Sequence, residues 1–306
     1  MTFGEHLEEL RRRILVGLIA FAAAFVAAFV FQEELMALFT RPYERARAEV
    51  NADLLRDWQA RPRHGAGADP SDAVVEALEG VIQALTPQVP AETASRLEEL
   101  AGRLRDRGPP QLGPLQAVGT TETFTAYMME CLLAALIVSA PVLLFELWRF
   151  VAAGLYQHER TLVLRVLPFS LALFFGGLAF GYLVLAEMSV RFLAGYGSFE
   201  HVVPQVTIAS YLGLLFLLLL AMGLVFQIPL VMTVLARTGL LQPAFFRGKR
   251  RYFILAIFVI AAIITPPDYI SMLLVAGPML LLFEAGIWLA AAAAKRRQER
   301  KPADAT

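Results

Sequence analysis

Acidic and basic side chains are interleaved just before the first apolar stretch of this 306-residue chain. Glu9 lies four residues before Arg13 there, and Glu159 lies beside Arg160 in a later polar segment. Carboxylates from two segments could hold guanidinium groups through paired, charge-assisted hydrogen bonds, which select arginine over lysine. The ordinary alternative is a set of solvated ion pairs, each stabilising a helix by roughly 0.2–0.5 kcal/mol. The pattern alone favours this second interpretation.

Patterns that indicate catalysis are missing from the sequence. None of the four histidines belongs to a zinc-binding H-E-x-x-H pair, and neither a G-x-S-x-G turn nor a phosphate-binding glycine-rich loop occurs. The single cysteine, Cys131, falls inside an apolar stretch, which rules out an intramolecular disulfide and a metal site made of cysteines. We therefore expect neither an enzyme nor an ATPase, and no cofactor or metal. Any work must draw on binding energy or the membrane potential.

The elements that must position the charged groups are apolar. Hydrophobic residues make up 58% of the chain and its mean hydropathy is +0.59, more than a soluble domain carries. Six stretches predict transmembrane helices, at about residues 14–31, 126–147, 166–185, 208–235, 253–264 and 269–294. The first could be a cleaved signal peptide, but acidic residues precede it and it continues past the small residues that could mimic a cleavage site. The fifth, at about 12 residues, is too short to cross a core about 30 Å thick comfortably.

Basic residues lie in the short loops of one side, which predicts the orientation. Arginines and lysines occur between the second and third stretches, between the fourth and fifth, and in the tail 295–306. Both termini are therefore expected in the cytoplasm. The sequence predicts an all-α membrane protein with six spans, divided into a first span (1–31), an external segment (32–124, with a helical insert at about 43–115), a helical region (125–294) and the basic tail.

The external insert is expected to contain at least one helix and to form a hairpin of two. Apolar residues at 74, 78, 81, 82 and 85 follow a helix start signal, and Leu97, Leu100 and Leu104 form a second stripe. We expect these stripes to pack on each other rather than on a partner. Residues 61–69 are typical of a flexible linker.

Two polar interruptions lie within the apolar stretches. Gln227 and Pro229 share one helical turn of the fourth stretch, so their freed backbone and amide groups need partners within the protein or in a wet cavity. A proline kink with one interhelical hydrogen bond is as plausible as a cavity lining. Glu130, near the start of the second stretch, raises the same question and could reach the outer interface.

The turn between the fifth and sixth stretches is expected to be tight. Pro266 and Pro267 cannot both continue a helix, because proline lacks an N–H and disfavours helical geometry before it. Asp268 follows them and could cap the last helix or take part in assembly with a partner.

At these residues the chain resembles the TatC family, the multi-spanning receptors of twin-arginine protein translocases. The resemblance covers about Phe3–Lys295 except the external insert. Its motifs occur in the same order, and they are His6-Leu7-Glu8-Glu9-Leu10-Arg11, Ser139-Ala140-Pro141 with Trp148 and Phe150, Leu155-Tyr156 with His158-Glu159-Arg160, Phe226 to Pro229, Thr265-Pro266-Pro267-Asp268 and Phe283-Glu284.

The resemblance implies a receptor in the cytoplasmic (inner) membrane for signal peptides with two consecutive arginines. Glu9 and Glu159 would receive the arginine pair, with Arg11 and Phe150 in the same cytoplasmic patch. Pro42 and Glu130 are weaker candidates along the path of the peptide's apolar part. The implied partners are folded cargo, membrane lipid and the single-span proteins TatA and TatB in an oligomeric complex driven by the proton-motive force, with no nucleic acid.

The chain departs from the family pattern at Gln227, Ala153 and Met272 and in its long external insert, which has no counterpart in that pattern. Gln227 stands where a glutamate is typical, so a mechanism that needs ionisation there is in doubt. Two other functions remain as alternatives. A small secondary transporter would explain the broken fourth stretch, although no internal repeat is apparent. A membrane scaffold would have the same topology without binding arginine specifically.

Overall fold

Helices form nearly all of the described chain. The computed structural model describes residues 3–60, 70–90, 92–97, 99, 111–153, 166–195, 205–265 and 269–299. Its elements are α1 (Phe3–Val30), α2 (Gln32–Ala60), α3 (Pro70–Leu85), η1 (Thr86–Gln88), α5 (Thr120–Ala153), α7 (Leu167–Phe180), η2 (Gly181–Leu185), α8 (Ala186–Gly195), α9 (Ile208–Val225), α10 (Ile228–Thr238), α11 (Pro243–Gly248), α12 (Arg250–Ile264) and α13 (Tyr269–Glu299). The prediction of an all-helical fold is confirmed for these residues.

Five units within the described residues are long and apolar enough to cross a membrane. They are Leu7–Val30, Thr120–Ala153, Leu167–Leu193, Ile208–Thr238 and Tyr269–Lys295. The fifth predicted stretch forms α12, whose 15 residues extend about 22 Å at 1.5 Å per residue, less than a core about 30 Å thick. By length the structure supports five spans, and the sixth remains a prediction.

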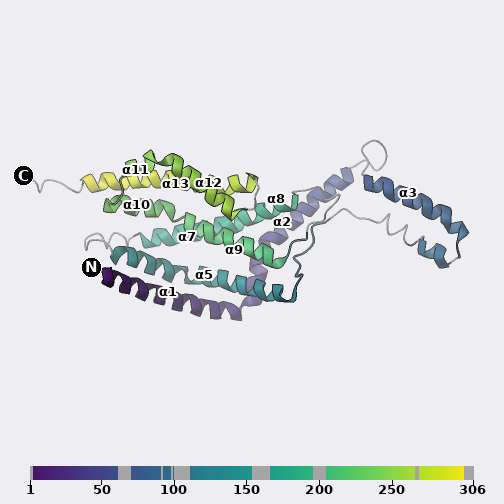
Figure 1. The fold of residues 1–306 in the computed structure, drawn as a ribbon, viewed down its shortest axis with the longest axis horizontal. Coiled ribbons are helices and arrows are strands. Elements are labelled where there is room, and N and C mark those ends of the chain that lie inside the picture. The colour runs from purple at the N-terminus through teal and green to yellow at the C-terminus, as the bar shows by residue number, and fades with distance from the viewer. Residues whose placement is uncertain are drawn as a thin grey trace, which may run out of the picture.

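The long helices lie side by side in one bundle. Figure 1 shows α1 beside α5 at one edge and the α12–α13 pair at the opposite edge, with α7 and α9 between them. The N-terminal end of α1 and the C-terminal end of α13 lie at the same end of the bundle. Every group near the start of α1 therefore shares that end with the last turns of α13.

Helices in a membrane associate through close packing, because lipid provides no hydrophobic driving force between them. Glycines allow such close crossings in this bundle. A Cβ on Gly177 of α7 would lie 2.5 Å from the carbonyl oxygen of Met222 in α9. Gly286 of α13 similarly faces Pro229, whose Cα would lie 3.1 Å from an added Cβ. These positions hold α7 against α9, and α13 against α10, at distances that no other residue type permits without movement.

The segment after α1 was not expected to be helical along its first 29 residues. Only Phe31 separates α1 from α2, which extends to Ala60. The buried face of α2 includes Phe39, Tyr43 and Ala46, at helical spacing. Because α2 is mostly polar, it leaves the bundle at the end opposite to the N-terminus, as Figure 1 shows.

Pro42 lies inside α2 and leaves one backbone carbonyl without its helical partner. That carbonyl belongs to Leu38, and it accepts a hydrogen bond of 2.5 Å from the hydroxyl of Tyr182 in η2. The neighbouring carbonyl of Phe39 accepts one of 2.8 Å from Tyr211 of α9. Two tyrosines from the bundle thus hold α2 at its proline.

The chain that returns from the insert is fastened to α2. The hydroxyl of Tyr43 donates to the carbonyl of Gly113 at 2.7 Å, and Asn51 both accepts from and donates to the backbone of Leu112. Burial raises the pKa of Tyr43 above its ordinary value, so the hydroxyl remains a donor well into the alkaline range. Further along, Gln116 pairs with Thr207 just before α9. The described residues at this end of the bundle are therefore held to one another by hydrogen bonds.

The helix α3 stands away from the bundle in Figure 1, and its main contacts are with η1. Its apolar residues Leu78, Val81 and Leu85 are exposed. The first insert helix is therefore confirmed. Most of the second predicted stripe, and the linker 61–69, lie outside the described residues, so the expected hairpin stays a prediction.

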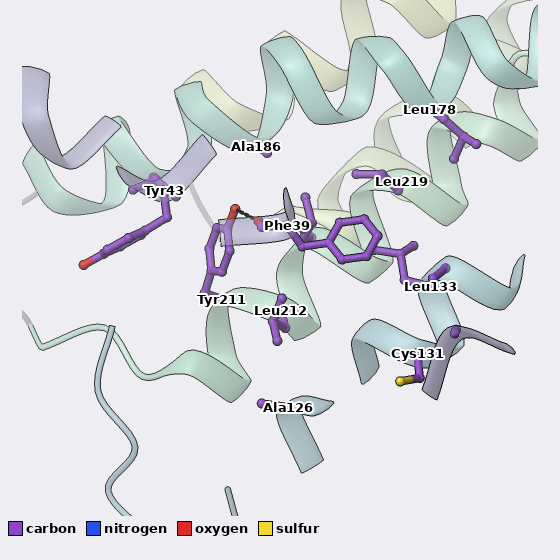
Figure 2. Close-up of a cluster of buried hydrophobic side chains, with 14 of the residues drawn as sticks. Phe39, Tyr43, Ala126, Cys131, Leu133, Leu178, Ala186, Tyr211, Leu212 and Leu219 are labelled. Atoms are coloured by element: carbon purple, nitrogen blue, oxygen red, sulfur yellow. Dashed lines mark hydrogen bonds between the residues drawn. The ribbon is translucent and has the colours of Figure 1, made fainter. Parts of the chain in front are cut away.

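The core nearest α2 is shown in Figure 2. Phe39 of α2 packs there with Tyr211 and Leu212 of α9 and with Leu133 of α5. Cys131 is fully buried in the same cluster, as expected for a small core residue. A second core joins α9 and α10 to α12 and α13.

Candidate functional site

Arg13 binds two carboxylates from two different helices. Its Nε donates to Oε1 of Glu9 at 2.8 Å, its second terminal nitrogen donates to the same oxygen, and its first terminal nitrogen donates to Oε2 of Glu146 at 2.8 Å. Glu9 and Arg13 are one turn apart on α1, whereas Glu146 belongs to α5. The i,i+4 pair foreseen from sequence therefore exists, but as half of a larger arrangement.

Tight packing of α1 on α5 brings these groups together. Gly17, one turn after Arg13, is so close to α5 that an added Cβ would lie 3.0 Å from Leu143. Leu143 precedes Glu146 by one turn, so the packing of its side chain on Gly17 places Glu146 within reach of the Arg13 side chain. Gly17, Ala24 and Ala28 are the buried small residues of this face of α1.

The guanidinium site is largely removed from solvent. The side chains of Arg13, Glu146 and Glu9 are 12%, 9% and 20% exposed. A second guanidinium, on Arg149, lies 3.9 Å from Oε1 of Glu146 and stacks over the ring of Phe145. The arrangement holds a planar cation between two carboxylates, which is geometry that a lysine ammonium cannot reproduce.

Of the other residues predicted for the cytoplasmic patch, the structure describes Arg11 and Phe150 but not Glu159. Arg11 is exposed on α1, and Phe150 is partly buried near the end of α5. Glu159 lies outside the described residues, so its predicted position beside Glu9 is not observed. The turn residues Pro266, Pro267 and Asp268 also lie outside the described residues.

Gln227 occupies the break between α9 and α10, and both its amide oxygen and its amide nitrogen are hydrogen-bonded. The hydroxyl of Ser170 in α7 donates to Gln227 Oε1 at 2.6 Å, and Gln227 Nε2 donates to the Ser170 carbonyl at 3.0 Å. Ser170 also accepts a hydrogen bond of 2.8 Å from the Trp148 indole in α5. The polar interruption at Gln227 and Pro229 is therefore confirmed, with protein partners for the amide.

Glu130 does not reach an outer surface, contrary to expectation. Its side chain is fully buried, and neither carboxylate oxygen has a hydrogen-bond partner among the described residues. It lies 16 residues before Glu146 on α5, about 24 Å along a continuous helix. Among the described residues, α5 therefore carries a paired carboxylate, Glu146, near its C-terminal end and an unpaired one, Glu130, ten residues after its start.

Sequence reasoning missed Glu146 and Ser170. Glu146 was readable as a carboxylate in the last turns of an apolar stretch, where an ionisable residue is costly and needs a partner. Ser170 gave no signal, because a serine in an apolar helix is common and only the fold brings it to Gln227.

Comparison with known proteins places these features in a family. Residues 5–278 match the family described as Sec-independent protein translocase protein (TatC). The TatC proteins of Desulforapulum autotrophicum and Koribacter versatilis are each 30% identical to this chain. The first match covers 96% of this chain and 86% of the relative, and the second covers 99% of this chain and 90% of the relative. Escherichia coli TatC is 36% identical over 63% of this chain and 74% of its own.

A solved structure supports the same assignment. The fold is similar, with a TM-score of 0.67 and 25% identity, to a structure described as the crystal structure of the twin-arginine translocase receptor TatC, covering 94% of this chain and 99% of that one. The chain therefore belongs to the TatC family, multi-pass membrane components of the Sec-independent protein translocase that serve transport rather than catalysis.

Proposed function

We propose that this chain is the signal-peptide receptor of a twin-arginine translocase and binds two consecutive arginines at its cytoplasmic face. The observation that supports the proposal is the contact of Glu9 and Glu146 with the Arg13 guanidinium, in which two carboxylates from two helices bind an arginine side chain. The similarity to a structure described as a receptor adds independent support.

In this proposal Glu9 and Glu159 receive the two arginines of the peptide. Arg11 and Phe150 belong to the same patch, where an exposed cation and an aromatic ring contact the peptide beside its arginines. Each carboxylate that accepts a charged hydrogen bond contributes about 1.5–3 kcal/mol to binding. The position of Glu159 relative to Glu9 is part of the proposal.

The proposal includes a six-span topology with both termini in the cytoplasm. Its support is the positive-inside rule and the position of α1 and α13, whose terminal ends share one end of the bundle. Arg247, Lys249 and Arg251, before and at the start of α12, are exposed cations that fit the same side. The helix α12 then enters the membrane as a short fifth span that thins the bilayer locally.

Partner binding is proposed along the outer face of α12. Leu255, Val259 and Ile263 are more than half exposed and follow one another every four residues. A single-span partner of the TatA or TatB type would cover this stripe, with Asp268 at its outer end. The proton-motive force would drive transport by the resulting oligomeric complex in the cytoplasmic membrane.

The apolar part of the signal peptide is proposed to follow the helices toward Glu130 and Pro42. Both are buried in the resting arrangement, so a peptide would contact them only after the helices separate. The unpaired carboxylate of Glu130 would then gain a partner.

Binding of peptides to the detergent-purified protein tests the receptor function. A twin-arginine signal peptide and its twin-lysine variant would be titrated against the wild type and against Glu9→Ala, Glu159→Ala and the control Glu8→Ala, whose side chain is exposed one residue from Glu9. We expect a wild-type preference for arginine that the first two variants reduce at least tenfold and the control leaves intact. Equal binding of both peptides by the wild type would refute the proposal.

A further inference from the structure

Arg13 resembles a bound ligand more than a surface ion pair. Exposed i,i+4 pairs are solvated on most sides, but here the arginine and Glu146 are each nearly nine-tenths buried. Removing charges from water is costly, and such a cluster is retained only where the geometry is good and the hydrogen bonds are satisfied. Three donor nitrogens of one guanidinium meet two carboxylates, which satisfies this condition.

The net charge of the cluster favours the approach of a second cation, which could replace Arg13. Glu9 and Glu146 carry two negative charges and Arg13 carries one positive charge, so the cluster has an excess negative charge that Arg149 balances only from 3.9 Å. Glu9 is the most exposed of the three, and its single oxygen Oε1 accepts both hydrogen bonds that it receives from Arg13. An arginine that arrives from solvent therefore meets Glu9 first.

We propose that Glu9 and Glu146 together form one guanidinium site, that Arg13 fills it when no cargo is bound, and that an arginine of the signal peptide displaces Arg13. Glu146 is thereby a specificity-determining residue of the receptor, although it lies on a different helix from Glu9 and outside the loop that carries Glu159. This inference rests on the proposed receptor function and adds the resident arginine and its second carboxylate.

Exchange of one guanidinium for another explains selectivity for arginine. The incoming group must form hydrogen bonds to the carboxylates on α1 and α5 at the same time. The planar guanidinium of arginine, with its five N–H donors, can do this, whereas the compact ammonium of lysine cannot. The displaced Arg13 side chain is long and begins beside Arg12, whose own side chain is exposed, so it can extend into water. Competition with the resident group also keeps single, unrelated arginines from binding tightly.

The test compares peptide affinity in variants of the full-length protein. In Arg13→Gln the peptide no longer competes with a resident cation, so we expect twin-arginine binding to tighten three- to tenfold and twin-lysine binding to change less than twofold. In Glu146→Gln we expect twin-arginine binding to weaken about tenfold and the arginine preference to shrink. Arg12→Gln, which removes the same charge from an exposed neighbour, should change affinity less than twofold.

Two further measurements keep the test decisive if Arg13→Gln folds poorly. Arg13→Lys keeps the charge, and its ammonium is expected to yield to the peptide more readily than the native guanidinium, so binding should tighten in the same direction. The thermal midpoint of Arg13→Ala should rise with agmatine, an alkylguanidinium, and stay unchanged with cadaverine, a diamine of equal charge. No difference between these two compounds would overturn the guanidinium site.

The outcomes separate this inference from the receptor function. If the wild type does not distinguish twin-arginine from twin-lysine peptides, the receptor function itself fails. If the wild type distinguishes them but Glu146→Gln keeps the full preference and the Arg13 variants bind no more tightly, only the resident-arginine site is wrong.

Discussion

Gly177→Ala should destabilise the bundle, although it adds a single methyl group. The new Cβ would lie 2.5 Å from the Met222 carbonyl oxygen and 3.0 Å from the ring of Phe226. Because the first contact is with backbone, α7 and α9 must separate by several tenths of an ångström or more. Overpacking of this kind costs about 1–3 kcal/mol.

The adjacent glycine provides a matched control. Gly176 meets nothing closer than 4.0 Å, so Gly176→Ala keeps the packing and gains the helical preference of alanine, about 0.5–1 kcal/mol. We therefore expect the two variants to differ by about 1.5–4 kcal/mol in the free energy of unfolding. Denaturant unfolding in mixed micelles measures this difference. Equal stability of the two variants would refute the close crossing of α7 and α9.

Two hydroxyl groups that donate hydrogen bonds between helices give further predictions for the same unfolding assay. Ser170→Ala leaves an indole N–H and a glutamine amide with fewer partners and should cost about 1–3 kcal/mol, whereas Ser139→Ala, which loses only a weak contact within its own helix, should cost less than 1 kcal/mol. Tyr182→Phe should cost about 1–2 kcal/mol, because the Leu38 carbonyl loses its donor at a position where Pro42 provides none. Pro42→Ala restores that backbone donor, so the loss caused by Tyr182→Phe should shrink in the double variant; an unchanged loss would contradict this reading of the proline.

The neutral amide at Gln227 fits its surroundings in a way that an ionised carboxylate would not. One side of the amide accepts from the Ser170 hydroxyl, and the other donates to the Ser170 carbonyl. A carboxylate would place a negative oxygen against that carbonyl. In this chain the polar contact at the break of the fourth span therefore stabilises the packing of α7 on α9 and α10 without a charge.

The apolar helices were predictable from the sequence, because a long apolar stretch in lipid must satisfy its backbone hydrogen bonds within itself, which a helix does. Prediction failed for α2, whose polar composition hid the stripe that contains Phe39 and Tyr43. The interruption at Gln227 was visible, since an amide and a proline in one turn break the local pattern.

Long-range pairing limited the prediction of the site. Glu9 and Arg13 were readable as neighbours because they are one helical turn apart. Glu146 is 133 residues from Arg13 along the chain, and no local rule could connect them. The burial of Glu130 was equally hidden, since its exposure depends on which helices cover α5.

A double-mutant cycle between the receptor and its peptide tests the central claim most directly. Glu9→Gln in the protein is combined with arginine-to-lysine changes at each of the two consecutive arginines of the signal peptide, and the binding free energies of all pairs are measured. The account predicts that Glu9 couples to one of these arginines by about 1.5–3 kcal/mol. Additive effects at both arginines, with coupling below about 0.3 kcal/mol, would show that Glu9 does not receive the twin arginines.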